Sequence, residues 1–262
     1  MKVAATIPAY QAEPWIADVV HRTLAHLPQV VVVDDGSSDA TAAAAKEAGG
    51  EVLVHPQNLG KGAALRSAFD HLFPNYDAVL TLDADGQHLP EEIPRLLAVP
   101  EADLVLGTRD HLFEAMSSVR RTSNQLSSRA ISWAAGEMLS DVQTGFRLYT
   151  RRLIDAVGFP EDRFEAESAV VVRACRGGFQ VVAVPVAMAE VDGRGTSHFR
   201  PVTDSLRIAG AVAKARMEDP CPCILSANSL EGAVEVPSSE RSPEPASSPA
   251  GLPKSSRAPH KA

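Results

Sequence analysis

The sequence predicts an α/β protein built on an open, mostly parallel sheet with helices on both faces. Short apolar runs alternate with segments of helical periodicity. Several of these runs are apolar at consecutive positions, which is typical of parallel strands buried on both faces. Ligands of such sheets bind at the carboxyl ends of the strands. The functional residues are therefore expected where the apolar runs end.

Each expected strand is a short apolar run that stops at a turn-forming or polar residue. The first run stops at Pro8, and the second consists of four consecutive valines before an acidic turn. Runs of this length and composition are typical of strands. In chain order, the expected strands are 2–8, 30–33, 51–55, 77–83 and 102–109.

Helices are expected between the strands. Pro14 suits the first turn of one helix, and apolar residues at helical spacing continue to Leu27. Another helix is expected over 60–72, and an amphipathic helix over 201–216. The boundary residues expected for the alanine-rich helix after the second strand are Ser38 or Asp39 as N-cap and Gly49 just past its end.

The composition divides the chain into two parts. The 262 residues are 45% hydrophobic, which is enough for one sizeable core and an appendage. Beyond Asp219 the sequence is rich in proline and serine and nearly lacks large apolar residues. Such a segment cannot bury enough surface to offset its ordering entropy. We therefore expect one ordered domain over 1–218 and a disordered tail over 219–262.

Charge and cysteine content exclude several classes of protein. A formal net charge of -8 argues against nucleic-acid binding, because there is no basic surplus to neutralise phosphates. No apolar run reaches the ~20 residues that span a bilayer. Three cysteines suit a reducing, cytoplasmic compartment. Cys221 and Cys223 could begin a metal site, but incidental thiols are favoured because no second pair accompanies them.

The stretch LTLDADGQHLP ends an apolar run in two carboxylates, Asp83 and Asp85. Gly86 permits the backbone turn that would let both approach one centre. Oxygen ligands of this kind suit Mg²⁺ or Mn²⁺, which also retain waters and substrate phosphate oxygens. The alternative is an acidic surface turn. The position directly after a buried strand favours the metal site.

A second group of residues suits a diphosphate. Gly60, Lys61 and Gly62 stand at a helix start, where backbone N–H groups attract anions and a lysine adds charge. The alternative for Lys61 is a solvated surface lysine, and the spacing is not that of a P-loop. Asp34 and Asp35 can accept hydrogen bonds from a base or a ribose. The alternative for this turn is a helix cap, but Ser38 or Asp39 can serve as the cap, which leaves Asp34 and Asp35 for another role.

Six segments together resemble family 2 glycosyltransferases in order and spacing, and most of all the branch that makes polyprenyl- or dolichyl-phosphate sugars. The segments are IPAYQAE, VVVDDGSSDAT, NLGKGAALRSAF, TLDADGQH, LVLGTR and SDVQTGFRLYTR, within a likeness that runs from about Lys2 to about Arg216. The resemblance implies that 1–218 is a catalytic domain of the GT-A fold. It also implies a nucleotide diphosphate sugar as donor, Mg²⁺ or Mn²⁺ as cofactor, and inversion at the sugar carbon.

The resemblance assigns roles by position. Asp141 falls on the candidate catalytic carboxylate, and Gln87 on a further metal ligand beside Asp83 and Asp85. His88 is expected to support the metal site or the acceptor side, since imidazole is not a usual Mg²⁺ ligand. Acceptor contacts are expected from Arg121, Asn124 and Arg129. With Lys61, the residues expected to contact the nucleotide sugar are Pro8, Tyr10, Glu13, Asp35, Asp83, Arg109, Arg147, Ser197 and Arg200.

These features predict an inverting glycosyltransferase that moves a sugar from a UDP- or GDP-sugar to an acceptor, with a polyprenyl phosphate as the acceptor that the branch implies. A nucleotidyltransferase is the first alternative, but PAYQAEPW lacks the Gly-rich loop of that class. A non-catalytic scaffold is the second, and the joint presence of Asp83, Asp85 and Asp141 argues against it. The 201–216 helix could rest on the inner membrane face, although packing on its own domain is favoured. The sugar, the base, the acceptor and the oligomeric state stay open.

Overall fold

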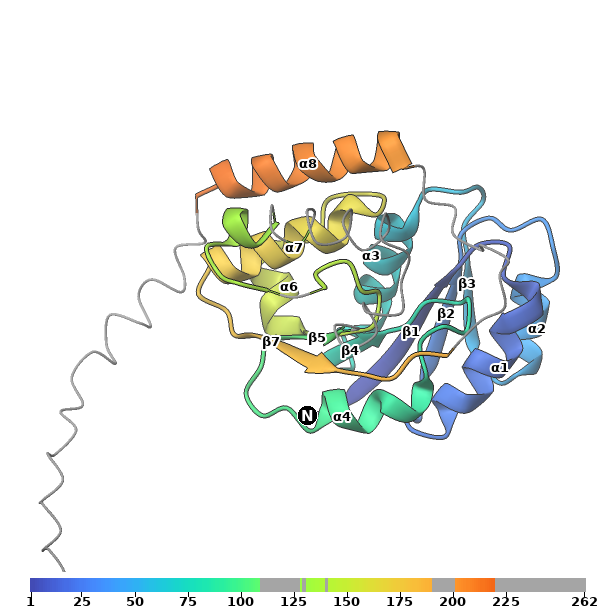
Figure 1. Cartoon of the computed structure of the whole chain (residues 1–262). Helices are drawn as coiled ribbons and strands as arrows, with labels where there is room; N and C mark the ends of the chain where they lie inside the picture. The colour runs from blue at the N-terminus through green and yellow to red at the C-terminus, as the bar shows by residue number, and fades with distance from the viewer. Residues whose placement is uncertain (109–127, 129–130, 140, 190–200, 220–262) are drawn as a thin grey trace, which may run out of the picture.

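The computed structural model describes residues 1–108, 128, 131–139, 141–189 and 201–219. Seven strands form one sheet in the order β3-β2-β1-β4-β6-β5-β7, as Figure 1 shows in part. β6 runs antiparallel to β4 and β5, and all other neighbours are parallel. The predicted open, mostly parallel sheet is confirmed. The strands are β1 (Val3–Ala9), β2 (Val30–Asp34), β3 (Glu51–Val54), β4 (Ala78–Thr81), β5 (Leu104–Thr108), β6 (Arg147–Thr150) and β7 (Val181–Pro185).

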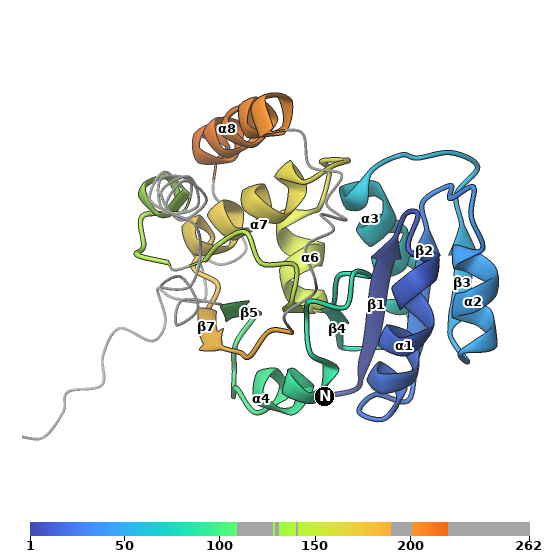
Figure 2. The same cartoon turned by 45° about the vertical axis from the view of Figure 1, so that its right-hand side comes forward.

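Helices cover both faces of the sheet (Figure 2). One face packs against α1 (Glu13–Leu24), α2 (Thr41–Glu47) and α4 (Ile93–Leu97), which follows the short 3-10 helix η1 (Pro90–Glu92). The other face packs against α3 (Lys61–Leu72), α6 (Arg151–Val157) and α7 (Glu165–Arg176), with α8 (Pro201–Met217) lying over α7. The core is therefore two apolar layers divided by the sheet.

The apolar face of α3 fixes the position of that helix. Leu65, Phe69 and Leu72 are buried, and the Phe69 ring lies 5.3 Å from Tyr149 of β6 and 5.2 Å from Phe159. Burying side chains of this size contributes roughly 1.5–3 kcal/mol each. Because this face is anchored in the core, the start of α3 is held at the edge of the sheet where β1 and β2 end.

All five predicted strands are present, whereas β6, β7, α4, α6 and α7 were not predicted. The predicted N-cap of α2 is wrong. The helix begins at Thr41 after Ala40, and Asp39 instead accepts a hydrogen bond from the Thr41 backbone N–H at 3.1 Å. Asp39 also accepts a hydrogen bond from the Glu13 backbone N–H at 3.3 Å and so links this loop to α1. The predicted tail, 219–262, lies outside the described residues apart from its first residue.

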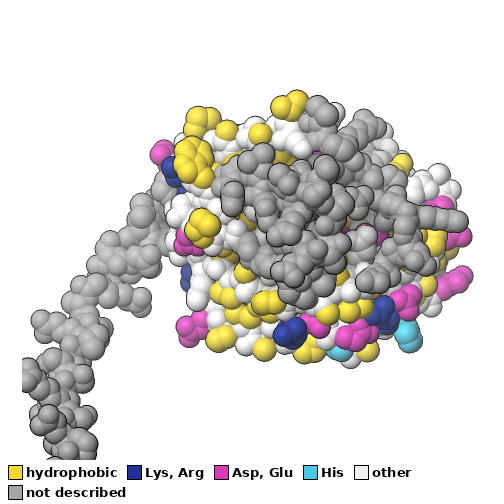
Figure 3. Space-filling view, viewed as in Figure 1, with side chains coloured by type: hydrophobic (Ala, Val, Ile, Leu, Met, Phe, Trp, Pro, Cys, Tyr) yellow, Lys and Arg dark blue, Asp and Glu magenta, His cyan; other side chains and the backbone are white. Residues whose placement is uncertain are grey.

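α8 packs on its own domain, as the sequence favoured. Ile208, Val212 and Ala215 are buried in the same apolar layer as α7. The outer side of α8 carries exposed Leu206 and Met217, and Figure 3 shows hydrophobic side chains over this helix. Within the described ranges, no helix has both the length and the apolar character that crossing a membrane requires.

Candidate active site

A cavity of about 590 Å³ opens at the carboxyl ends of β1, β2 and β4. Its volume lies in the range of small-molecule sites, about 300–1,000 Å³. The position is the one expected for ligands of an open α/β sheet. The polar residues and prolines that line it include Pro8, Tyr10, Asp35, Lys61, Asp83, Asp85, Arg163, Asp204 and Arg207.

Asp83 and Asp85 both line this cavity, just past the end of β4. The Asp85 carboxylate accepts a hydrogen bond from the backbone N–H of Gln87 at 3.0 Å, which holds the turn together. Burial raises the pKa of Asp85, and the negative charge of Asp83 raises it further. Two carboxylates that oppose each other's ionisation in one cavity are suited to a shared cation. The donor set therefore fits a hard divalent ion such as Mg²⁺ or Mn²⁺.

The described part of the chain contains no group of three or more His, Cys, Asp or Glu side chains arranged to hold a metal ion. A cation at Asp83 and Asp85 would thus take further ligands from a substrate, from water or from residues outside the described ranges. Mg²⁺ sites with one or two carboxylates and substrate phosphates follow this pattern. The arrangement suits a cation that binds together with a diphosphate.

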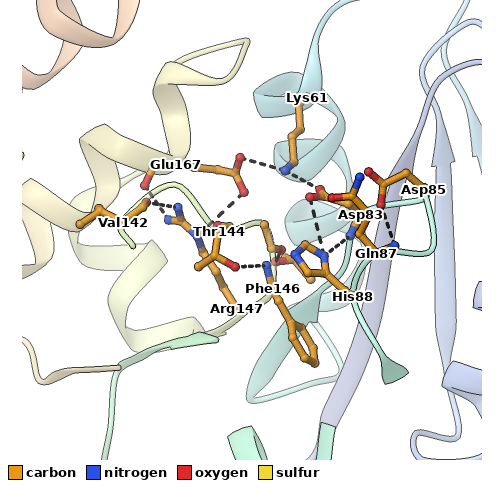
Figure 4. A network of polar contacts seen from close by, with 12 residues as sticks. Lys61, Asp83, Asp85, Gln87, His88, Val142, Thr144, Phe146, Arg147 and Glu167 are labelled. Carbon is orange, nitrogen blue, oxygen red and sulfur yellow. Dashed lines mark hydrogen bonds and ion pairs between the residues drawn. The ribbon is translucent and has the colours of Figure 1, made fainter. Parts of the chain in front are cut away.

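Lys61 supplies a positive charge beside the two carboxylates (Figure 4). Its Nζ lies 2.6 Å from Asp83 Oδ1 and 2.9 Å from Glu167 Oε2. Burial alone lowers the pKa of Lys61, but the charges of Asp83 and Glu167 outweigh burial and raise this pKa above its ordinary value. The ammonium is therefore charged at neutral pH. It is part of the cavity wall and not a solvated surface lysine.

Asp35 organises the loop that leads into α3. The buried carboxylate accepts hydrogen bonds from the backbone N–H groups of Leu59 at 2.9 Å and Gly60 at 2.7 Å, and it lies 2.7 Å from His55 Nδ1. The Ala63 N–H donates to the Asp162 carbonyl at 2.9 Å. Two of the N–H groups at the start of α3 thus already have protein partners. This limits the expected role of that helix start in diphosphate binding and leaves Lys61 as its main contribution.

The antiparallel direction of β6 brings the Asp141 loop to the same edge of the sheet. Arg147, the first residue of β6, is paired with Thr81, the last residue of β4. The loop before β6 therefore lies beside Asp83, and a β-carbon at Gly145 would overlap the Asp83 carboxylate. Asp141 is buried in this loop with a φ of 40°. Its backbone carbonyl accepts a hydrogen bond from the Thr144 N–H at 3.3 Å, so the residue also forms a local turn.

His88 lies behind Asp83. Its Nδ1 accepts a hydrogen bond from the Asp83 backbone N–H at 3.1 Å and lies 3.6 Å from Asp83 Oδ2. The ring is 2% exposed and is stacked 5.5 Å from the Phe146 ring. Figure 4 shows it beneath the Asp83 side chain. This position supports the carboxylate from the core side, which suits the supporting role expected from the sequence.

Four described residues that were expected in the site are not part of the cavity lining: Glu13, Gln87, Asp141 and Arg147. Glu13 accepts a hydrogen bond from the Ala40 N–H at 3.1 Å and so joins α1 to the loop before α2. Arg147 is fully buried, and its guanidinium donates to the carbonyls of Val142 at 2.8 Å and Thr144 at 2.6 Å. The structure therefore corrects the expectation that Arg147 reaches a diphosphate or acceptor. It organises the loop that carries Asp141.

Several expected residues lie outside the described part of the chain: Arg109, Arg121, Asn124, Arg129, Ser197 and Arg200. Conversely, sequence reasoning missed the wall formed by Arg163 and Phe164 before α7 and by Asp204 and Arg207 on α8. It also missed Gly145 and Glu167. Arg207 is one of several basic residues on an amphipathic helix, and no local pattern distinguishes it from the others.

The chain was compared with known proteins. Residues 5–158, more than half of the chain, match the family described as Glycosyl transferase family 2. An undecaprenyl-phosphate 4-deoxy-4-formamido-L-arabinose transferase from Pseudomonas fluorescens (strain Pf0-1) is 33% identical over 214 residues, covering 76% of this chain and 61% of that protein. Glycosyltransferase AglJ from Haloferax volcanii is 30% identical over 203 residues, covering 75% of this chain and 66% of that protein. The chain thus spans less than two thirds of the length of these curated relatives.

A solved structure shares the fold. Glucosyl-3-phosphoglycerate synthase from Mycobacterium tuberculosis, in complex with Mn²⁺, uridine diphosphate and phosphoglyceric acid, matches with a TM-score of 0.63 at 19% identity. The match covers 84% of this chain and 79% of that one, and it confirms the predicted GT-A architecture. The undecaprenyl-phosphate transferase among the relatives fits the branch that the sequence motifs resemble. The chain belongs to glycosyl transferase family 2.

Proposed function

We propose that this protein transfers a sugar from a nucleoside diphosphate sugar to a polyprenyl phosphate, with a divalent cation at the donor site. The observation that carries the proposal is the convergence of Asp83, Asp85 and Lys61 on one cavity at the carboxyl ends of the strands. Family membership supports the reaction class. The relative from Pseudomonas fluorescens, named for undecaprenyl phosphate, supports the acceptor.

Charge explains what the residues would do. Breaking the sugar–phosphate bond leaves negative charge on the nucleoside diphosphate, and Lys61 stands where it can stabilise that charge. Asp83 and Asp85 would hold Mg²⁺ or Mn²⁺, which neutralises a leaving diphosphate when bound. Tyr10, Trp15 and Asp35 line the end of the cavity toward β1 and β2, and we assign them to the nucleoside. The lining therefore separates a nucleoside end from a charged diphosphate end.

The acceptor decides what Asp141 does. A phosphate acceptor is already ionised at neutral pH and can attack the sugar carbon from the face opposite the leaving group without a strong base. Asp141 would then orient the acceptor or stabilise positive charge on the sugar ring. A hydroxyl acceptor would instead need Asp141 as general base. With a polyprenyl phosphate, we assign Asp141 the orienting role.

The test is a transfer assay with the full-length protein. Undecaprenyl phosphate in detergent is incubated with a panel of UDP- and GDP-sugars in Mn²⁺, and lipid-linked sugar is measured by mass spectrometry. We expect a lipid-linked product from at least one donor, and its loss in EDTA and in Asp85→Asn. Transfer that occurs only to a soluble hydroxyl acceptor would contradict the lipid acceptor. A product formed equally well in EDTA would contradict the metal assignment.

A further inference from the structure

Glu167 on α7 is a buried carboxylate that lies outside the cavity lining. Its side chain is 7% exposed, and burying a charge this far is costly unless the charge is paired. Two cations face it: Lys61 Nζ at 2.9 Å from Oε2, and Arg147 Nε at 3.9 Å from Oε1. Oε1 is buried and has no hydrogen-bond partner among the residues that the structure describes. The carboxylate is thus directed at Lys61.

The Lys61 ammonium contacts two carboxylates. Asp83 reaches it from the cavity and Glu167 from the core, as Figure 4 shows. A lysine head group is a point charge on a flexible four-carbon stem, so one partner alone does not fix its position. Without Glu167, the ammonium would pair with Asp83 alone. It would then compete directly with a cation for that carboxylate.

Arg147 gives Glu167 a fixed support. The guanidinium is fully buried and donates to the backbone carbonyls of Val142, Thr144 and Glu167 itself. These contacts tie β6, the Asp141 loop and α7 together at one point. The charges therefore form a chain from buried Arg147 through Glu167 and Lys61 to the partly exposed Asp83, and only Lys61 and Asp83 line the cavity.

We propose that Glu167 is a positioning residue of the donor site. It holds the Lys61 ammonium against the cavity wall, which keeps Asp83 available to a divalent cation and keeps a positive charge beside the diphosphate. This inference rests on the proposed function, because it presumes that the cavity binds a metal-bound nucleoside diphosphate. It adds a residue on α7 that acts through Lys61 and does not contact the ligand.

The proposal makes a prediction opposite to that of simple charge counting. Replacing Glu167 with glutamine removes a negative charge near an anion site, and Coulomb attraction alone would then strengthen binding of the diphosphate. If Glu167 positions Lys61, the variant should bind the diphosphate more weakly and should require more Mn²⁺. The reason is that the Lys61 ammonium would then pair with Asp83 alone. The sign of the change therefore separates the two accounts.

The experiment is calorimetric titration of the full-length protein with UDP or GDP, whichever the wild type binds, across a series of Mn²⁺ concentrations. For Glu167→Gln we expect the Mn²⁺ concentration that gives half-maximal nucleotide binding to rise about tenfold, as for residues that support metal ligands. Asp103→Asn is the matched control, because its carboxylate is similarly buried, pairs with Arg152 of α6 and lies outside the cavity lining. It should stay within about twofold of the wild type.

A double-mutant cycle completes the test. If Glu167 acts through Lys61, then Glu167→Gln should cause no further loss in a Lys61→Gln background. If the single Glu167 variant does not fold, the Lys61→Gln variant can still be compared with the double variant, in which both members of the pair are neutral. Unchanged or tighter binding in Glu167→Gln, or an additional loss in the double variant, would overturn the proposal. Failure of the wild type to bind either nucleotide would instead reject the proposed function, and this inference with it.

Discussion

At the scale of single residues, the position of the Asp83 carboxylate depends on Gly145, where a side chain would not fit. Gly145 lies directly against it, and a β-carbon there would overlap the carboxylate oxygens. The Gly145 carbonyl accepts a hydrogen bond from buried Thr81 Oγ1 at 2.8 Å, so the loop cannot easily move away. The end of β4 and the loop before β6 are thus closely packed at the point where a cation would bind.

We predict that Gly145→Ala impairs the donor site more than it impairs the fold. The added methyl group must displace Asp83, so Mn²⁺-dependent nucleotide binding should weaken at least about tenfold. Overpacking of this kind costs about 1–3 kcal/mol of stability. Gly210→Ala on α8 is the control, since a β-carbon there meets no atom within 4 Å. Calorimetry and thermal unfolding measure both effects, and wild-type binding by Gly145→Ala would refute the packing argument.

Six residues that the sequence predicted for the donor site line one cavity: Pro8, Tyr10, Asp35, Lys61, Asp83 and Asp85. They meet because each lies at or just past the end of a strand, or at the start of a helix, at the same edge of the sheet, and their roles in binding stay predictions. This result follows from the geometry of parallel strands, which carries polar strand ends to one side. Such reasoning works only for residues whose element and direction are evident from local pattern.

Residues contributed by distant helices could not be found in this way. Arg207 and Arg163 reach the cavity from α8 and from the segment before α7, and no periodicity indicates that these segments pack there. For Arg147 the prediction failed in the opposite way. Its position in SDVQTGFRLYTR suggested a ligand contact, but the side chain is buried. Its burial depends on β6 pairing antiparallel with β4, which the sequence did not predict.

At the scale of secondary-structure elements, the wall formed by α8 depends on its attachment to α7. Arg173 of α7 is paired with Glu161 at 2.5 Å and with Glu218, just after α8, at 2.7 Å. The hydrogen bond from Arg173 stabilises the Glu218 carboxylate and lowers its pKa below the usual range. The contribution of this pair to stability is therefore complete above the ordinary glutamate pKa, about 4.3, and is lost as pH falls through the lowered value.

We predict that Glu218→Gln destabilises the protein at pH 7 and that this effect shrinks as the pH falls below the ordinary glutamate pKa. The loss at pH 7 should be about 1 kcal/mol or less, because the Glu218 side chain is 37% exposed and solvent screens the pair. Denaturant unfolding of wild type and variant at pH 7 and at a pH below the ordinary glutamate pKa measures the difference. A difference in stability between the two proteins that stays constant from pH 7 to the lower pH would show that the pair contributes through packing and not through charge.

The strands β6 and β7 were not predicted, for different physical reasons. β6 has four residues and follows a motif whose glycine and polar residues indicate a turn. β7 is an edge strand whose residues are partly exposed, so it lacks the continuous burial of β1, β2, β4 and β5. Short and edge strands are specified by their neighbours more than by their own sequence. β1, β2, β4 and β5 were predictable because they are apolar at consecutive positions, and β3 because it is a short apolar run between turn residues.

At the scale of the whole molecule, sheet direction and helix placement meet at one edge. β1, β2 and β4 end there, the antiparallel β6 begins there, and α3 starts there. One edge therefore collects the carboxylates, the lysine and the loop of Asp141. Asp204 and Arg207 of α8 line the same cavity. The site is the product of the topology and not of any single motif.

The central claim is that Asp83 and Asp85 hold a divalent cation that in turn binds a nucleoside diphosphate. Calorimetric titration with UDP and with GDP, each in Mn²⁺ and in EDTA, tests it most directly, with Asp85→Asn measured in parallel. We predict that one nucleotide binds the wild type in Mn²⁺, and that this binding is lost in EDTA and weakened at least tenfold by Asp85→Asn. A folded wild type that binds neither nucleotide, or that binds one equally well in EDTA, would contradict the claim.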